Sequence, residues 1–137
     1  MCGRFALTSD ESSLCEHFRV TLSIPIKPRF NIAPSQKLLI IRLQSETKKH
    51  TSSLVRWGLI PSWAKDQSIG TRLTNARSET ALTKPSFRDS FRRRRCRIPA
   101  TGFYEWTTSG KRKQPYYVRL TSNEPFGIGG LWDSWED

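Results

Sequence analysis

The chain has 137 residues, enough for one domain that buries roughly two-thirds of the surface its unfolded form exposes. Its 23 Lys and Arg outnumber its 12 Asp and Glu, and the net charge of +11 favours a polyanionic partner such as a nucleic acid. No run approaches the ~20 apolar residues of a membrane span and no apolar signal run follows Met1, so we expect a cytoplasmic protein with no membrane partner, associated with the nucleoid if it is bacterial.

The first predicted element is a short helix within residues 8–20. Thr8 and Glu11 have the spacing of a capping box, in which each side chain bonds a backbone N–H at the start of a helix. Leu14 and Phe18 lie four residues apart and therefore share one face. We expect that face to pack on the core.

Strands are predicted next. Three prolines make residues 23–36 extended and irregular. The run KLLIIRL, residues 37–43, is typical of a buried strand. A polar loop, residues 44–53, then leads to a second strand at residues 53–59.

The second half of the chain is predicted to contain a helix and a hairpin. Residues 77–84 form the helix, which ends at Pro85. Residues 96–107 and 115–121 form strands joined by a polar turn, and residues 125–132 form one more strand. Many short strands with few short helices predict an α+β fold dominated by a curved antiparallel sheet.

Cys2 is the first residue with distinctive chemistry. Removal of Met1 would leave an amine and a thiol on adjacent carbons, which close an aldehyde into a five-membered thiazolidine or attack an acyl group. The alternative is that Cys2 is merely a tolerated small residue. Cys15 and Cys96 are interpreted as ordinary thiols, since three cysteines without a CxxC pair exclude a disulfide framework and structural zinc. We expect no metal and no cofactor.

Two further segments carry groups suited to catalysis. Glu105 stands between Tyr104 and Trp106, and a carboxylate beside apolar rings suits proton transfer. The alternative is a solvated glutamate on an edge strand. Asn75 and Arg77 lie where a strand passes into a helix, where an amide can donate and accept while a guanidinium clamps a phosphate. The alternative is that Asn75 simply caps the helix.

Basic and aromatic residues favour contact with nucleic acid. The segment FRRRRCR, residues 91–97, has five arginines, and residues 110–113 add three cations at a hairpin tip. Of the two tryptophans in RWGLIPSW, we expect Trp57 to join the core and Trp63 to stack on an unpaired base.

Six segments, in order, resemble one family. They are MCGRF, RFNIAP, VRWGLIPSWAK, NARSET, RCRIPATGFYEW and KQPYYV, spread over residues 1 to about 120. The chain resembles the SRAP family, the SOS-response-associated peptidases. The resemblance implies a twisted, barrel-like, mainly antiparallel sheet with a few flanking helices, forming one domain over residues 1–137.

The resemblance also implies a function in DNA damage. Members of this family sense abasic sites in single-stranded DNA and form a covalent thiazolidine cross-link that shields the lesion. It implies that Cys2, Asn75 and Glu105 are catalytic. Residues matching the DNA-binding surface are Arg4, Asn31, Trp63 and Arg77. The alternatives are a non-covalent module for single-stranded nucleic acid and an N-terminal-cysteine peptidase or hydrolase.

The chain departs from the family pattern at its end. Family members continue further and supply a histidine in an HxR stretch, whereas His17 and His50 lack that context. We therefore expect a C-terminally truncated domain that binds DNA, cross-links more slowly than longer relatives and self-associates. Trp132 and Trp135 are expected to pack against the body or a partner, because their rings have little reason to stay in water.

Overall fold

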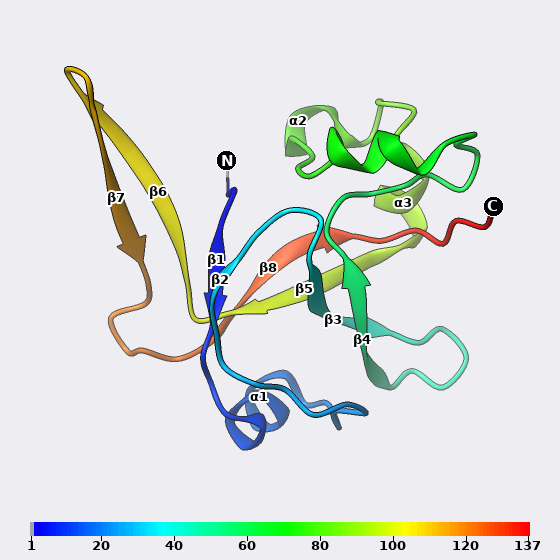
Figure 1. Cartoon of the computed structure of the whole chain (residues 1–137). Helices are drawn as coiled ribbons and strands as arrows, with labels where there is room; N and C mark the ends of the chain where they lie inside the picture. The colour runs from blue at the N-terminus through cyan, green and yellow to red at the C-terminus, as the bar shows by residue number, and fades with distance from the viewer. Residues whose placement is uncertain (1) are drawn as a thin grey trace.

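A computed structural model gives the structure and describes residues 2–137. Two antiparallel sheets, each of four strands, and a few short helices make the predicted α+β fold (Figure 1). The first sheet has the order β2 (Arg29–Ile32), β1 (Phe5–Leu7), β6 (Gly102–Ser109), β7 (Arg112–Val118). The second has the order β4 (His50–Arg56), β3 (Lys37–Leu43), β5 (Arg95–Ala100), β8 (Phe126–Leu131). The mainly antiparallel sheet that the resemblance implies is confirmed, but within residues 2–137 neither sheet closes into a barrel.

The break between the two sheets falls inside a segment predicted as one strand. Residues 96–107 divide into β5 and β6, which belong to different sheets. Thr101 lies at the division, and its N–H donates to the Ala6 carbonyl at 2.8 Å while its hydroxyl accepts the Thr8 N–H at 3.1 Å. Thr101 thereby ties the chain to β1 at the point where it leaves the second sheet. Alternation of polar and apolar residues carries no signal for such a change of sheet.

The first helix is α1 (Glu11–Phe18), and its cap differs from the prediction. Asp10 is the N-cap, with its carboxylate accepting the Ser13 N–H at 2.8 Å. The predicted capping box is wrong: the Thr8 hydroxyl instead forms a hydrogen bond with the Thr101 hydroxyl, with the two oxygens 3.1 Å apart. The predicted buried face is confirmed, since Leu14 and Phe18 are both buried.

The predicted helix at residues 77–84 is shorter in the structure, and two further helices accompany it. Its helical part is α2 (Ser78–Ala81). A 3-10 helix, η1 (Gln67–Thr71), precedes it, and α3 (Arg88–Arg93) follows within the arginine-rich segment. Phe87 is buried and takes the N-cap position of α3. The many charged residues that follow it gave no sign of a helix in the sequence. None of the helices within residues 2–137 is long and apolar enough to cross a membrane.

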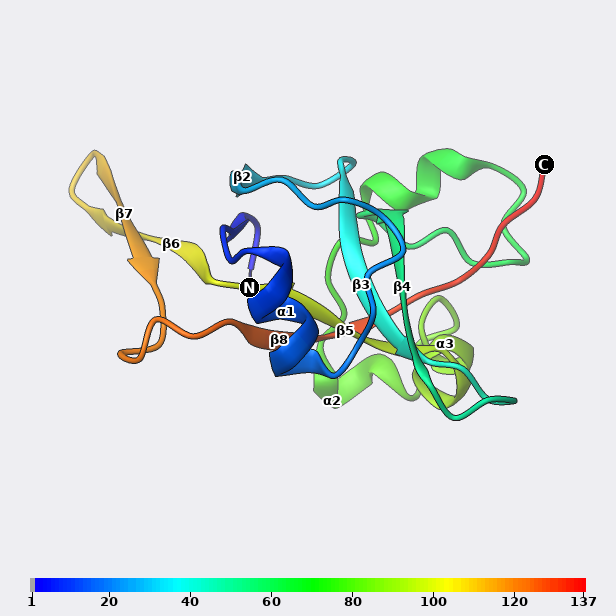
Figure 2. The same cartoon turned by 90° about the horizontal axis from the view of Figure 1, so that it is seen from below.

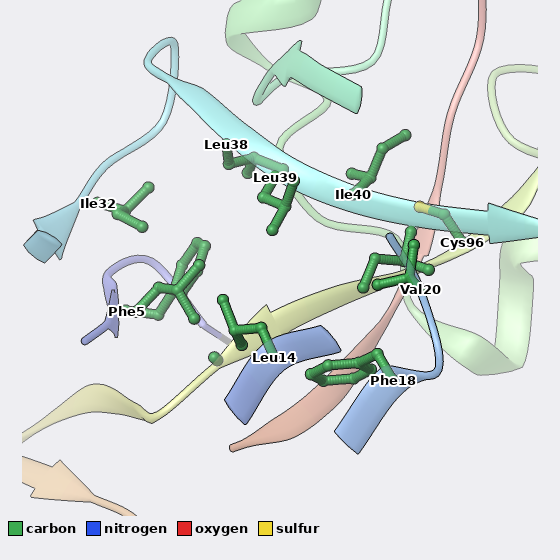
Figure 3. Close-up of a cluster of buried hydrophobic side chains, with 12 residues drawn as sticks. Phe5, Leu14, Phe18, Val20, Ile32, Leu38, Leu39, Ile40 and Cys96 are labelled. Carbon is green, nitrogen blue, oxygen red and sulfur yellow. The ribbon is translucent and has the colours of Figure 1, made fainter. Parts of the chain in front are cut away.

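One hydrophobic core holds the sheets and α1 together. Side chains from β1, α1, β3 and β5 point toward one another in the space between these elements (Figure 3). The buried members of the cluster are Phe5, Leu7, Leu14, Phe18, Val20, Ile32, Leu38, Leu39, Ile40, Ile41, Cys96 and Ala100. Trp57 packs against this cluster, which confirms its predicted place in the core.

The rest of the molecule lies on either side of this core. The β6–β7 hairpin projects from the body on one side, and η1, α2 and α3 lie on the other, in both views (Figures 1 and 2).

The C-terminal tryptophans pack on the body, as predicted. The Arg42 guanidinium lies 4.4 Å from the centre of the Trp132 ring, and the Trp135 indole N–H donates to the Ala64 carbonyl at 2.7 Å.

Candidate functional site

Cys2 lies just before β1, half-buried against the core. Its Sγ lies 3.6 Å from the Arg4 carbonyl oxygen, to which the thiol donates. Burial raises the pKa of the Cys2 thiol, and the nearby carboxylate of Glu105 acts in the same direction, against the lowering effect of the Arg4 hydrogen bond. The thiol is therefore protonated at neutral pH, and its attack on an electrophile needs a partner that takes the proton.

Asn75 approaches Cys2 from the segment between η1 and α2. Its Nδ2 donates to the Cys2 carbonyl oxygen at 2.9 Å. The helix-capping alternative is wrong, because Arg77 occupies the N-cap position of α2 and no side chain caps that helix. Asn75 instead joins two parts of the chain that lie 73 positions apart.

Glu105 is half-buried on β6, where it pairs with Tyr116 of β7. Its two sequence neighbours form part of an aromatic cluster: the Tyr104 ring lies 6.4 Å from the Trp106 ring and 5.1 Å from the Tyr117 ring. Glu105 is near enough to Cys2 for its charge to act on the thiol. The structure thus brings Cys2, Asn75 and Glu105 to one place.

A second pair of predicted residues lies next to Cys2. The Arg4 guanidinium donates to Asn31 Oδ1 at 3.1 Å, joining the segment before β1 to β2. The Tyr104 hydroxyl donates to the Phe30 carbonyl at 2.8 Å, which fixes β2 relative to β6. Phe30 itself is 68% exposed. This edge of the first sheet therefore presents a guanidinium and an aromatic ring to solvent.

Trp63 and Arg77 stand apart from this cluster. Both side chains are exposed, and Trp63 is 56% exposed on the loop that follows β4. Within residues 2–137, neither side chain has a hydrogen bond or ion pair to the residues around Cys2. They are available to a ligand lying across the surface, and the structure leaves their predicted roles as predictions.

The arginine-rich segment divides into structural and exposed residues. Arg94 forms an ion pair with Asp133 at 3.2 Å, and Arg97 donates to the Phe18 carbonyl at 3.2 Å. Arg92, Arg93 and Arg95 are exposed. The sequence predicts that the whole run contacts phosphates, but in the structure Arg94 and Arg97 form contacts within the protein.

Cys2 and Asn75 also line a cavity of about 620 Å³. Most of the lining is apolar and comes from β3, β5, β8 and residues 57–91, including Trp57, Phe87 and Ile98. The cluster of polar groups around Cys2 is therefore sheltered on one side by apolar surface, which strengthens electrostatic interactions within it.

Neither histidine lines the cavity that Cys2 and Asn75 share, whereas Cys96 does. His50 is placed between the Arg19 carbonyl and the Arg97 guanidinium, at 3.3 Å from each, and His17 contacts the Phe18 ring. Burial raises the pKa of Cys96 to about 11, as fits an inert core thiol. Among the described residues, no group of three or more His, Cys, Asp and Glu side chains could hold a metal ion.

Comparison with known proteins places the chain in a family. The family model described as SOS response associated peptidase (SRAP) matches residues 1–137. The chain is 42% identical over 139 residues to the abasic site processing protein YoqW of Bacillus subtilis, covering 98% of this chain and 61% of that protein. It is 33% identical to the abasic site processing protein YedK of Escherichia coli, covering 96% of this chain and 59% of that protein.

Solved structures of other proteins share the fold of this chain. A crystal structure of a protein from Bacteroides thetaiotaomicron superposes with a TM-score of 0.87 at 24% identity, covering 99% of this chain and 62% of that one. A protein from Bordetella bronchiseptica gives a TM-score of 0.83 at 25% identity, covering 98% of this chain and 64% of that one. The chain thus spans about 60% of the length of each of these four relatives.

Proposed function

The chain belongs to the SOS response associated peptidase (SRAP) family, and we propose that it recognises abasic sites in single-stranded DNA and captures them covalently through Cys2. The observation that carries this proposal is the arrangement around Cys2, where Asn75 holds the Cys2 carbonyl at 2.9 Å and Glu105 acts on the thiol. Curated relatives named abasic site processing proteins support the choice of substrate.

The proposed reaction needs the α-amine of Cys2, and hence removal of Met1, which lies outside the described residues. The amine attacks the aldehyde carbon of the ring-opened sugar, and loss of one water gives an imine. The Cys2 sulfur then bonds to the imine carbon, and the thiol proton passes to the nitrogen. The product is a five-membered thiazolidine, and the net change is the loss of one water.

Glu105 and Asn75 have separate roles in this scheme. The pKa of the Cys2 thiol is raised, so sulfur attack needs a base. We assign that role to the Glu105 carboxylate, whose charge acts on the thiol; it accepts the proton and returns it to nitrogen. The Asn75 amide donates to the Cys2 carbonyl through its Nδ2, and we assign the rest of the amide the role of bonding the sugar hydroxyls.

The DNA backbone is proposed to lie across the exposed cations. Arg4, Arg77 and the exposed arginines at the end of α3 and the start of β5 offer charged donors to phosphates. Trp63 offers a ring on which an unpaired base can stack. Affinity should therefore fall with salt, with a log–log slope of roughly −0.7 per phosphate contact. Replacing Arg77 should weaken binding by a similar factor for every sequence.

The deciding experiment is an intact-mass measurement after incubation with an abasic single-stranded oligonucleotide. We expect the mass of the protein without Met1, plus the oligonucleotide, less one water. Cys2→Ser should lose the stable adduct but still yield an imine that borohydride traps, because its amine remains. A heat-stable adduct from Cys2→Ala would place the reactive group elsewhere.

The same experiment distinguishes the alternative functions. Reversible, salt-sensitive binding without any adduct would indicate a non-covalent module for single-stranded nucleic acid. Cleavage of an amide substrate without an adduct would indicate an N-terminal-cysteine hydrolase. For Glu105→Gln we expect a rate lower by ~10²-fold or more with DNA affinity retained, since general acid–base catalysis typically contributes ~10²–10⁴-fold. An equal loss of affinity would make Glu105 a structural residue.

We also propose that this domain self-associates. Strand β7 lies at the edge of the first sheet, and the hairpin exposes large apolar side chains: Trp106 45%, Tyr116 54%, Tyr117 42% and Val118 41%. Such edges pair readily with other strands. Light scattering should show a mass that rises with concentration; a monomer mass at every concentration would contradict this proposal.

A further inference from the structure

A hydrogen bond from Trp57 reaches the residue directly before Asn75. The Trp57 indole N–H donates to the Thr74 carbonyl at 2.7 Å. Nearby, the Leu59 N–H donates to the Leu73 carbonyl at 2.9 Å. Residues 73–74 belong to an irregular segment between η1 and α2, where no strand or helix ladder fixes the backbone. These two bonds therefore set where Asn75 lies.

Trp57 is itself held firmly. Its main-chain N–H donates to the Gln36 carbonyl, and its carbonyl accepts the Ser35 N–H, both at 2.9 Å. Its ring packs against the ring of Phe5, with centres 5.5 Å apart. Phe5 is 2% exposed and lies three residues after Cys2 on the same stretch of chain.

These contacts form a closed path. It runs from Cys2 along the chain to Phe5, from that ring to Trp57, from the indole N–H to Thr74, and from Asn75 back to the Cys2 carbonyl. Trp57 touches the segment carrying Cys2 through Phe5 and the segment carrying Asn75 through Thr74. We propose that Trp57 is a positioning residue, which acts by holding the Asn75 amide against Cys2; the proposal rests on the proposed function.

The chain offers a matched control for this proposal. Trp135 donates its indole N–H to the Ala64 carbonyl, also at 2.7 Å, in a contact that involves no residue of the path described. Trp57→Phe and Trp135→Phe each remove one indole hydrogen bond of the same length while keeping an aromatic ring. Both should lower thermal stability. Only Trp57→Phe should slow adduct formation at saturating abasic DNA, by about five-fold, the size expected for one lost hydrogen bond.

A double-mutant cycle shows whether Trp57 acts through Asn75. In an Asn75→Ala background, Trp57→Phe should leave the remaining rate within two-fold, because the group it positions is gone. Rates slowed five-fold in both backgrounds, or slowed equally by Trp135→Phe, would overturn the proposal. Affinity for DNA should stay the same in Trp57→Phe, which separates positioning from a general loss of the binding surface.

A readout that needs no DNA separates this proposal from the proposed function. In ¹⁵N spectra, the Asn75 side-chain amide is assigned by its absence in Asn75→Ala. Trp57→Phe should shift that signal and speed its hydrogen exchange several-fold, while Trp135→Phe leaves it in place. An unchanged Asn75 signal in Trp57→Phe would overturn the positioning role. If the unmodified protein forms no adduct at all, the proposed function fails, and the amide signal still decides the role of Trp57.

Discussion

Gly58 and Gly70 mark a close crossing of the chain, and Gly58→Ala tests what that crossing does. Gly58 has a φ of +127°, in the region that favours glycine, and an added Cβ would lie 2.4 Å from the Gly70 carbonyl oxygen. The crossing brings residues 57–59 against residues 70–74, the pairing that carries the Trp57–Thr74 hydrogen bond. An alanine at Gly58 therefore has to push these two segments apart.

The cost has two parts. The unfavourable backbone conformation costs about 1–2 kcal/mol for a residue with a Cβ. The contact with a backbone oxygen cannot be relieved by a side-chain rotation, and overpacking of this kind costs about 1–3 kcal/mol. The total is about 3 kcal/mol. With an unfolding entropy of roughly 0.3 kcal/mol/K for a domain of this length, Tm should fall by about 10 °C.

Urea unfolding followed by tryptophan fluorescence gives the free energy, and the adduct rate gives the effect on the site. Gly129→Ala is the matched control, since Gly129 lies in β8 with an ordinary φ and nothing within 4 Å of an added Cβ. It should be neutral or slightly stabilising. If Gly58→Ala is as stable as Gly129→Ala, or forms adduct as fast as the unmodified protein, the crossing does not hold the site.

Four further outcomes follow from the core and the titrating groups. Leu14→Ala should lower the free energy of unfolding by about 3 kcal/mol, because Leu14 is 0% exposed and its removal leaves a cavity; thermal melting checks this. Arg94→Ala should cost about 3 kcal/mol, since it leaves Asp133, whose side chain is 7% exposed, without its cation; a smaller loss in Arg94→Ala/Asp133→Asn than in Arg94→Ala alone would support this origin. The folded pKa of Cys96 is raised from 9.0 to about 11, so between these values the unfolded chain releases a proton that the folded chain keeps. The contribution of Cys96 to stability should be constant below pH 9 and decline by roughly 2–3 kcal/mol as pH rises through 11, and Cys96→Ala should remove that part of the decline. The raised pKa of Cys2 predicts that its alkylation by iodoacetamide, followed by peptide mass, continues to accelerate above pH 9, and a plateau below that pH would contradict the burial described.

The sequence alone determined the local features of this protein. The spacing of Leu14 and Phe18 defined the buried face of α1, and the run at residues 37–43 defined β3, because hydrophobic periodicity acts over a few residues. The motifs around Cys2, Asn75 and Glu105 identified the family, which the comparisons confirmed over residues 1–137.

Only the tertiary structure decided how distant segments meet. Thr8 caps no helix because Thr101 takes its hydroxyl, and Asn75 caps no helix because it reaches the carbonyl of Cys2, 73 positions away. The strand predicted at residues 96–107 divides at Thr101 because hydrogen bonds to β1 hold the chain there. In each case a polar group forms a hydrogen bond with a residue far away in the sequence in place of a local one. The pattern of neighbouring residues cannot predict this, because the distant partner comes within hydrogen-bonding distance only when the sheets and the core have formed.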